Sequence, residues 1–176
     1  MGFRSLFEMA PQFMVPTHGT TALVRWALFN MLIGNSDAHA KNISFFKYRL
    51  GISPAPAYDL VSTRVYDVVS EMAMAFGDAL LAEEVTASDL DIFATDAGIT
   101  VDELIKEIEA MAPAALEHAF ELATSNMYTD EERALLLNIA ELVRTQATHL
   151  LGVASASRRL LRLKGPGRIL AKTKSI

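Results

Sequence analysis

The most constraining feature of the sequence is an apolar helix that runs directly into a polar loop. Residues 22–33 read ALVRWALFNMLI, and apolar side chains surround the segment on nearly all sides. This pattern predicts a central, buried helix that starts after Thr20-Thr21 and ends at Gly34. The following residues, GNSDAHAKN, are too rich in Gly, Asn, Ser and Asp to continue the helix. A polar loop is therefore attached to a rigid, buried element.

A short hairpin is expected after the loop, and an irregular segment before the helix. Residues 43–48 predict one strand, residues 49–51 a turn, and Ile52 the start of a return strand. Residues 1–19 carry two prolines and a glycine close to the helix, which predicts irregular structure. Residues 71–76 fit either a strand or a turn.

Beyond residue 85 the chain is expected to be helical. Helices are predicted near 87–97, 101–124 and 130–151, with Pro113 as a candidate kink in the second and Gly152 closing the third. Each begins with a pattern typical of a capping box, in which Thr is followed three residues later by an acid. The pairs are Thr86 with Asp89, Thr100 with Glu103, and Thr129 with Glu132. The sequence thus predicts a mainly α fold of the α+β class.

Composition fits one globular domain. Of the 176 residues, 51% are apolar and 21% are charged, which suits a chain with a single core. Since no apolar run approaches the roughly 20 residues of a membrane-spanning helix, we expect no membrane partner. Cysteine is absent, which excludes disulfides and thiolate metal sites and agrees with a cytoplasmic location.

The charge is unevenly distributed along the chain. Residues 157–176 contain seven basic and no acidic residues, whereas the formal net charge of the whole chain is −5. We therefore divide the chain into a lobe at 1–156 and a basic tail at 157–176. The acidic lobe argues against direct nucleic-acid binding. The tail is interpreted as a solvated terminus, with contact to phosphate as the alternative.

Three polar residues on this framework indicate a particular chemistry. Asp37 and Asn42 lie five residues apart on the loop, and Asp59 follows the hairpin. In phosphoryl transfer a carboxylate accepts the proton of the attacking hydroxyl, while amide and carboxylate oxygens bind Mg²⁺. The spacing D-x-x-x-x-N also occurs in the catalytic loop of protein kinases. The alternatives are that Asp37 and Asn42 are turn residues and that Asp59 is a cap.

The segments FNMLIGNSDAHAKNISFF and PAYDLVST, with SEMAMAFGD and MAPAALEHA further on, resemble HipA-type serine/threonine kinases. The resemblance implies the helical C-terminal lobe of a HipA/protein-kinase-like fold, with ATP as donor and Mg²⁺ as metal. It makes Asp37 the catalytic base and Asn42 and Asp59 the metal ligands. It places Lys41 near the transferred phosphate and His39 in the cofactor-binding loop, where His39 orients the base.

The family also implies parts that this sequence lacks. Upstream of Thr20 there is no Gly-rich loop and no ATP-binding lysine, so we expect negligible phosphate transfer by the chain alone. Expected partners are a HipB-like antitoxin or a separate N-lobe polypeptide, and a protein substrate in the translation machinery. Two alternatives stay open, a non-catalytic remnant or split-gene subunit and a small-molecule phosphotransferase, although PAYDLVST argues against the second.

Overall fold

The computed structural model describes residues 2–66 and 71–164, and its fold is mainly helical with one small sheet. The expected α+β class is confirmed. The helices are α1 (Phe3–Phe7), α2 (Pro16–Leu32), α3 (Ala87–Ala97), α4 (Val101–Thr124) and α5 (Asp130–Lys164). The strands are β1 (Phe45–Tyr48) and β2 (Gly51–Pro54), which form an antiparallel hairpin. Short 3-10 turns lie at Ala10–Gln12, Ala40–Asn42, Thr63–Val65 and Ala82–Glu84.

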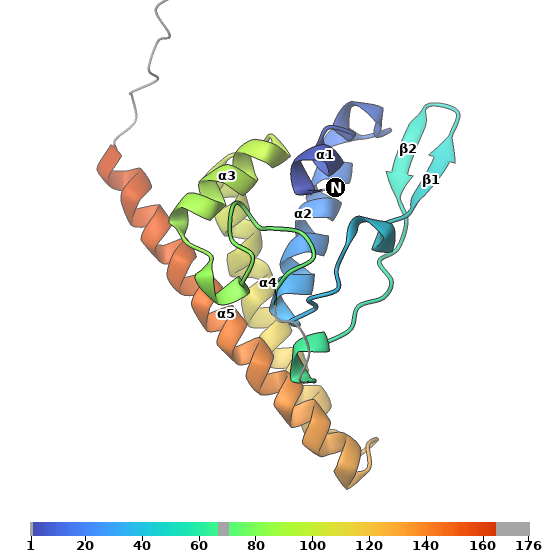
Figure 1. Cartoon of the computed structure of the whole chain (residues 1–176), viewed down its shortest axis with the longest axis vertical. Helices are drawn as coiled ribbons and strands as arrows, with labels where there is room; N and C mark the ends of the chain where they lie inside the picture. Colours follow the sequence, from blue (N-terminus) through green and yellow to red (C-terminus); the bar gives the residue numbers. More distant parts are fainter. Residues whose placement is uncertain (1, 67–70, 165–176) are drawn as a thin grey trace, which may run out of the picture.

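The helix α2 lies at the centre of the molecule, as its apolar sequence predicts. Ten of its 17 residues are buried, and it packs against both α4 and α5 (Figure 1). On another side, α1 packs on α3 through a cluster of phenylalanine rings. Phe76 and Phe93 stack with centroids 4.0 Å apart, and Phe3 meets Phe93 edge-on at 5.1 Å. A rigid core therefore supports the N-terminal half of the chain.

The prediction of an irregular segment at residues 1–19 is wrong at both ends. A short helix, α1, occupies Phe3–Phe7, and α2 begins at Pro16 rather than after Thr21. Proline suits the first turn of a helix because its missing N–H has no partner to lose there. Gly19 adds a second reason, since a Cβ at this position would lie 2.3 Å from the Phe13 ring. The glycine that suggested a loop instead permits close packing inside a helix.

The prediction that the last helix ends at Gly152 is also wrong. Helix α5 continues to Lys164, so the first eight residues of the predicted basic tail are helical. Ala154 and Ser157 are buried beyond the glycine, which shows that packing continues past it. Burial of this face outweighs the modest helix-breaking tendency of one glycine. Residues 165–176 of the tail lie outside the described residues.

The other two long helices match their predicted bounds. All three capping boxes form: for example, the Asp89 carboxylate accepts hydrogen bonds from the Thr86 amide at 2.8 Å and hydroxyl at 2.6 Å. Helix α4 continues through Pro113. In segment 71–76, left open between strand and turn, the structure has bends and one isolated bridge between Phe76 and Ala79.

The hairpin follows the polar loop as predicted, although β1 begins two residues later than expected. Gly51 opens β2 with a φ of 148°, and a Cβ there would lie 2.6 Å from the Gln12 carbonyl oxygen. The N-terminal segment crosses the hairpin at this point, where the Met14 amide donates to the Ile52 carbonyl at 2.9 Å. Phe13 also stacks on Phe45. These contacts fix the base of the hairpin on the body.

Candidate active site

The polar loop, residues 34–42, leaves α2 through a Schellman motif. Gly34, with a φ of 67°, donates to the Met31 carbonyl at 3.1 Å, and the Asn35 amide donates to the Asn30 carbonyl at 2.8 Å. A side chain at Gly34 would also collide with Leu142 of α5, 2.5 Å from the position of its Cβ. The direction in which the loop starts is thus set by the end of a buried helix.

The buried side chain of Asn35 connects the loop to the segment that follows the hairpin. Its Nδ2 donates to Asn30 Oδ1 at 2.8 Å and to the Asp59 carbonyl at 3.0 Å. Its Oδ1 accepts from the Asp37 amide at 3.2 Å. Asn30 in turn donates to the Trp26 carbonyl at 2.8 Å within α2. A ladder of amides therefore links the central helix to the backbones of Asp37, the predicted base, and Asp59, a predicted metal ligand.

The structure brings the two predicted metal ligands, Asn42 and Asp59, together. Asn42 Nδ2 donates to the Asp59 carboxylate across 17 residues of sequence. Asn42 is buried, and its Oδ1 accepts from the His39 amide at 3.3 Å. Asp59 has a φ of 57°, the left-handed region that non-glycine residues rarely adopt. The backbone at Asp59 is thus held in an unusual conformation at the point where its carboxylate meets Asn42.

The other three predicted site residues lie on the same loop. Asp37 and Lys41 are exposed, and among the described residues neither forms an ion pair. His39 is half-buried, and its amide donates to the Asp37 carbonyl at 2.9 Å. Its Nδ1 is buried and has no hydrogen-bond partner in the described part of the chain. Backbone hydrogen bonds of the loop therefore hold Asp37 and His39 close together. The chemical roles of Asp37, His39 and Lys41 stay predictions.

Tyr58 and Thr63 of the PAYDLVST segment support the loop. The Tyr58 hydroxyl donates to the Lys41 carbonyl at 2.8 Å. The Thr63 Oγ1 accepts from the Ser36 amide at 2.7 Å and donates to the Gly34 carbonyl at 3.2 Å. These bonds close the loop at both of its ends, so the two segments form one unit.

The donor atoms at Asn42 and Asp59 fit Mg²⁺. Asn42 Oδ1 and the Asp59 carboxylate are hard oxygen atoms, although it is Asn42 Nδ2 that faces the carboxylate. Mg²⁺ in phosphoryl-transfer sites is held by one or two carboxylates together with waters and substrate phosphates. Asn42 Oδ1 has a second lone pair beyond the one that faces His39. Within the described residues there is no group of three His, Cys, Asp or Glu side chains that could hold a metal ion. The arrangement therefore suits a metal that shares its coordination with a substrate.

Comparison with known proteins agrees with this geometry. Residues 1–119 match the family described as HipA-like C-terminal domain. The chain belongs to this family. A HipA-like relative, the serine/threonine-protein kinase toxin HipA of Shewanella oneidensis, is 37% identical over 113 residues, which cover 64% of this chain and 26% of the relative. A Sinorhizobium fredii relative is 32% identical over 135 residues, 74% of this chain and 32% of the relative.

A solved structure of HipA extends the likeness to three dimensions. The Shewanella oneidensis HipA, in a complex with HipB and operator DNA, matches with a TM-score of 0.82 at 28% identity. The match covers 90% of this chain and 38% of that chain. The HipA-like chain described here thus spans about a quarter to a third of the length of the curated relatives it matches. Its similarity to HipA is to the C-terminal part.

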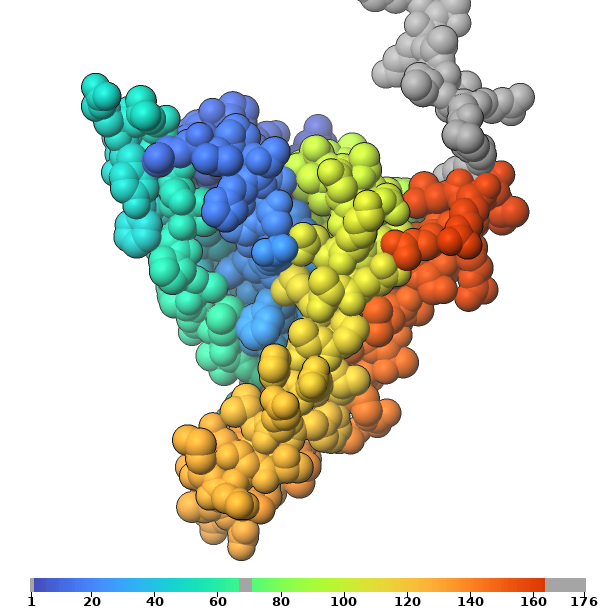
Figure 2. Space-filling model, turned by 180° about the vertical axis from the view of Figure 1, so that it is seen from behind, coloured from blue at the N-terminus to red at the C-terminus, as the bar shows by residue number. Residues whose placement is uncertain are grey.

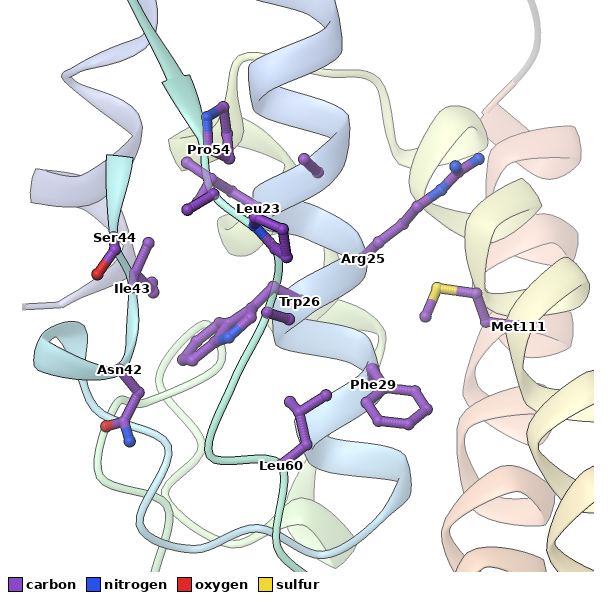
Figure 3. Close-up of a pocket in the computed structure, with 14 residues that line it drawn as sticks. Leu23, Arg25, Trp26, Phe29, Asn42, Ile43, Ser44, Pro54, Leu60 and Met111 are labelled. Atoms are coloured by element: carbon purple, nitrogen blue, oxygen red, sulfur yellow. The ribbon is translucent and has the colours of Figure 1, made fainter. Parts of the chain in front are cut away.

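A pocket of about 430 Å³ lies directly behind the loop of this HipA-like domain (Figure 3). Apolar side chains of α2 and of residues 54–60 line it, with Met111 of α4 at the far side and Asn42 at one end. The charged group at its rim, Arg25, pairs with Glu107 at 2.7 Å. The pocket is therefore an apolar space that separates the Asn42 and Asp59 pair from α4.

The sequence pattern does not predict that Asn30 and Asn35 connect the candidate site residues. Asn30 stands in the apolar segment 22–33, and Asn35 in the polar segment GNSDAHAKN. A signal was present, because an amide on a buried stripe requires a hydrogen-bond partner.

Within the described residues, no helix is both long and apolar enough to cross a membrane.

Proposed function

We propose that this chain is the catalytic lobe of a HipA-like kinase that transfers the γ-phosphate of ATP to a Ser or Thr hydroxyl of a protein. The observation that carries the proposal is the contact between Asn42 and Asp59, which come from separate segments. The Asn42 amide meets the Asp59 carboxylate through its Nδ2, so the two predicted metal ligands lie side by side, and Asn35 connects the backbones of Asp37 and Asp59. The closeness of these residues supports a role in phosphoryl transfer, which uses a carboxylate base beside amide and carboxylate metal ligands.

Each residue then has a distinct task. Asp37 is exposed on its turn, so its carboxylate is open to an acceptor hydroxyl and takes up that proton. Asn42 and Asp59 hold Mg²⁺, which neutralises charge on the transferred phosphate when it is bound. Lys41 is exposed beside them and adds a positive charge near the phosphate. The role of His39 is to orient the loop through its amide bonds.

Partners follow from the length of the relatives. Because HipA-like relatives are three to four times longer than their matched parts, we infer that a separate N-lobe polypeptide, or an N-lobe preceding this region, supplies the remaining ATP contacts. The HipA structure contains HipB, which supports a HipB-like antitoxin as a second partner. The family resemblance favours a substrate in the translation machinery. The absence of cysteine suits the reducing cytoplasm.

The test is binding of Mg²⁺-ATP, measured by calorimetry with the chain alone and with an N-lobe polypeptide taken from the Shewanella relative. We expect binding and phosphorylation only with the N-lobe present. Asp59→Asn should then weaken metal-dependent ATP binding by about 10–100-fold, and Asp37→Asn should leave binding intact but remove phosphorylation. The exposed Asp78 provides the matched control, since Asp78→Asn should change neither.

Two results would contradict the proposal. Equal ATP binding by the Asp59→Asn variant would show that Asp59 holds no metal. Tight binding to the N-lobe or antitoxin without any phosphorylation would favour the alternative of a non-catalytic subunit.

A further inference from the structure

The Asn35 side chain occupies a position that the proposed catalytic roles do not use. It is 5% exposed and makes three hydrogen bonds, one to α2, one to the loop and one to the segment after the hairpin. One of these bonds, to the Asp59 carbonyl, joins residues that are 24 positions apart in sequence. Such a residue is well placed to control the distance between the loop and Asp59.

The hydrogen-bond pattern allows one orientation of this amide. Nδ2 faces two oxygen acceptors, Asn30 Oδ1 and the Asp59 carbonyl, while Oδ1 faces the Asp37 N–H. Rotating the amide by half a turn would place oxygen against two oxygens and N–H against N–H. Since the site is buried, these unpaired groups could not turn to water. The amide is therefore locked, and so are the backbones that it contacts.

We propose that Asn35 is a positioning residue, which couples the catalytic loop to the metal-binding segment by holding the backbones of Asp37 and Asp59 in one arrangement. The inference rests on the proposed function, because it assigns a role toward the same two aspartates. Asn35 touches neither aspartate side chain in this network; it acts through their main-chain groups. Asn30 supports it from α2 as an acceptor.

The left-handed backbone at Asp59 is the element on which this coupling acts. A φ of 57° is unfavourable for a residue with a Cβ, so it persists only where surrounding contacts impose it. The bond from Asn35 to the Asp59 carbonyl is one such contact. When it is removed, the backbone at Asp59 is free to return to a negative φ. Its carboxylate then leaves Asn42, and the pair of oxygen ligands is lost.

The experiment compares the wild-type chain with Asn35→Ala by NMR, using Mn²⁺ as the metal probe. In the wild type, Asp59 should show the strong intraresidue HN–Hα Overhauser effect that a positive φ produces, and Mn²⁺ should broaden the signals of Asn42 and Asp59. In the variant we expect the Overhauser effect to weaken. The affinity for Mn²⁺ should fall about 10–100-fold, as is usual when a residue that orients a metal ligand is removed.

Asp89→Asn is the matched control, because Asp89 is also buried and also fastens loop backbone, but far along the chain from these motifs. It should lower stability while leaving the Asp59 signal and the Mn²⁺ affinity unchanged. If Asn35→Ala matches the wild type in both readouts, Asn35 has no positioning role. If the wild type binds no Mn²⁺ at Asn42 and Asp59 even with ATP and the N-lobe polypeptide present, the proposed metal site fails, whereas the Overhauser comparison still decides the role of Asn35, so the two failures can be told apart.

A second variant covers the case in which Asn35→Ala does not fold. Asn35→Asp keeps the shape of the side chain and an acceptor for the Asp37 amide, but it sets a carboxylate oxygen against the Asp59 carbonyl. The same loss of the Asp59 conformation and of Mn²⁺ affinity is expected. An unchanged Overhauser effect at Asp59 in this variant would overturn the proposal.

Discussion

At the scale of single residues, buried polar side chains fix the loops of this domain. Asp89 is 7% exposed, and its carboxylate accepts from the Thr86 amide and hydroxyl and from the Asp78 amide. Burial alone would raise the pKa of Asp89. The hydrogen bonds lower the pKa by more than burial raises it, so the pKa lies below its ordinary value of 3.8. The charged form is thus the one that the folded state stabilises.

The acid dependence of stability should follow from this. A carboxylate with a depressed pKa in the folded state stabilises the fold above pH 3.8, and this contribution is lost as the pH falls below that value. Asp89→Asn should lower the free energy of unfolding by about 1–3 kcal/mol at pH 7. The difference from wild type should shrink at pH 3 in urea denaturation. Asp91→Asn, at an exposed position of the same helix, is the control and should change the free energy of unfolding little at either pH. If Asp89→Asn lowers the free energy of unfolding equally at pH 7 and pH 3, the Asp89 carboxylate is not the cause.

At the scale of elements, sequence patterns predicted most helices and the hairpin but failed where packing overrides local preference. Capping boxes located the starts of α3, α4 and α5 because both partners of each cap lie within four residues. Gly19 and Gly152 suggested a loop and a helix end, yet both lie inside helices. Gly19 lies against the Phe13 ring, and Ser157 is buried beyond Gly152. Local sequence encodes neither of these packing contacts.

The same limit applies to the candidate site. The spacing of Asp37, Asn42 and Asp59 predicted a shared site, and the structure brings Asn42 and Asp59 into contact. The ladder through Asn30 and Asn35 was not predicted, because it depends on how the segment after the hairpin returns to the end of α2. Contacts of this kind are set by the tertiary fold.

Gly152 allows a direct test of the unbroken α5. A Cβ at Gly152 would have nothing within 4 Å, and the helix continues around it, so Gly152→Ala should raise the free energy of unfolding by about 0.5–1 kcal/mol. Gly98 is the matched control: it has the same open space but a φ of 67°. Gly98→Ala should therefore destabilise by about 1–2 kcal/mol. Thermal unfolding measures both, and a destabilising Gly152→Ala would indicate that the helix breaks there.

At the scale of the whole molecule, the hairpin carries several exposed apolar side chains. In segment 1–19 the side chains of Phe3, Leu6, Phe7 and Phe13 are buried, whereas Met14 and Val15 are exposed. On the hairpin, Phe46 and Tyr48 are each 51% exposed and Leu50 is 76% exposed. Figure 2 shows the hairpin as a ridge at the edge of the molecule.

We expect this apolar ridge to drive self-association at high concentration when no partner covers it. Burying one large apolar side chain contributes about 1.5–3 kcal/mol, so Phe46→Ser with Leu50→Ser should weaken association at least about tenfold in sedimentation velocity. The strands should survive, because the contacts of Phe13 with Phe45 at the base of the hairpin are kept.

Met127 is 86% exposed at the opposite tip, and Met127→Ser should leave association unchanged. If Met127→Ser weakens association as much as the Phe46 and Leu50 substitutions do, the association depends on general surface hydrophobicity and not on the hairpin. If the wild-type chain stays monomeric at every protein concentration tested, the exposed side chains of the hairpin do not drive self-association.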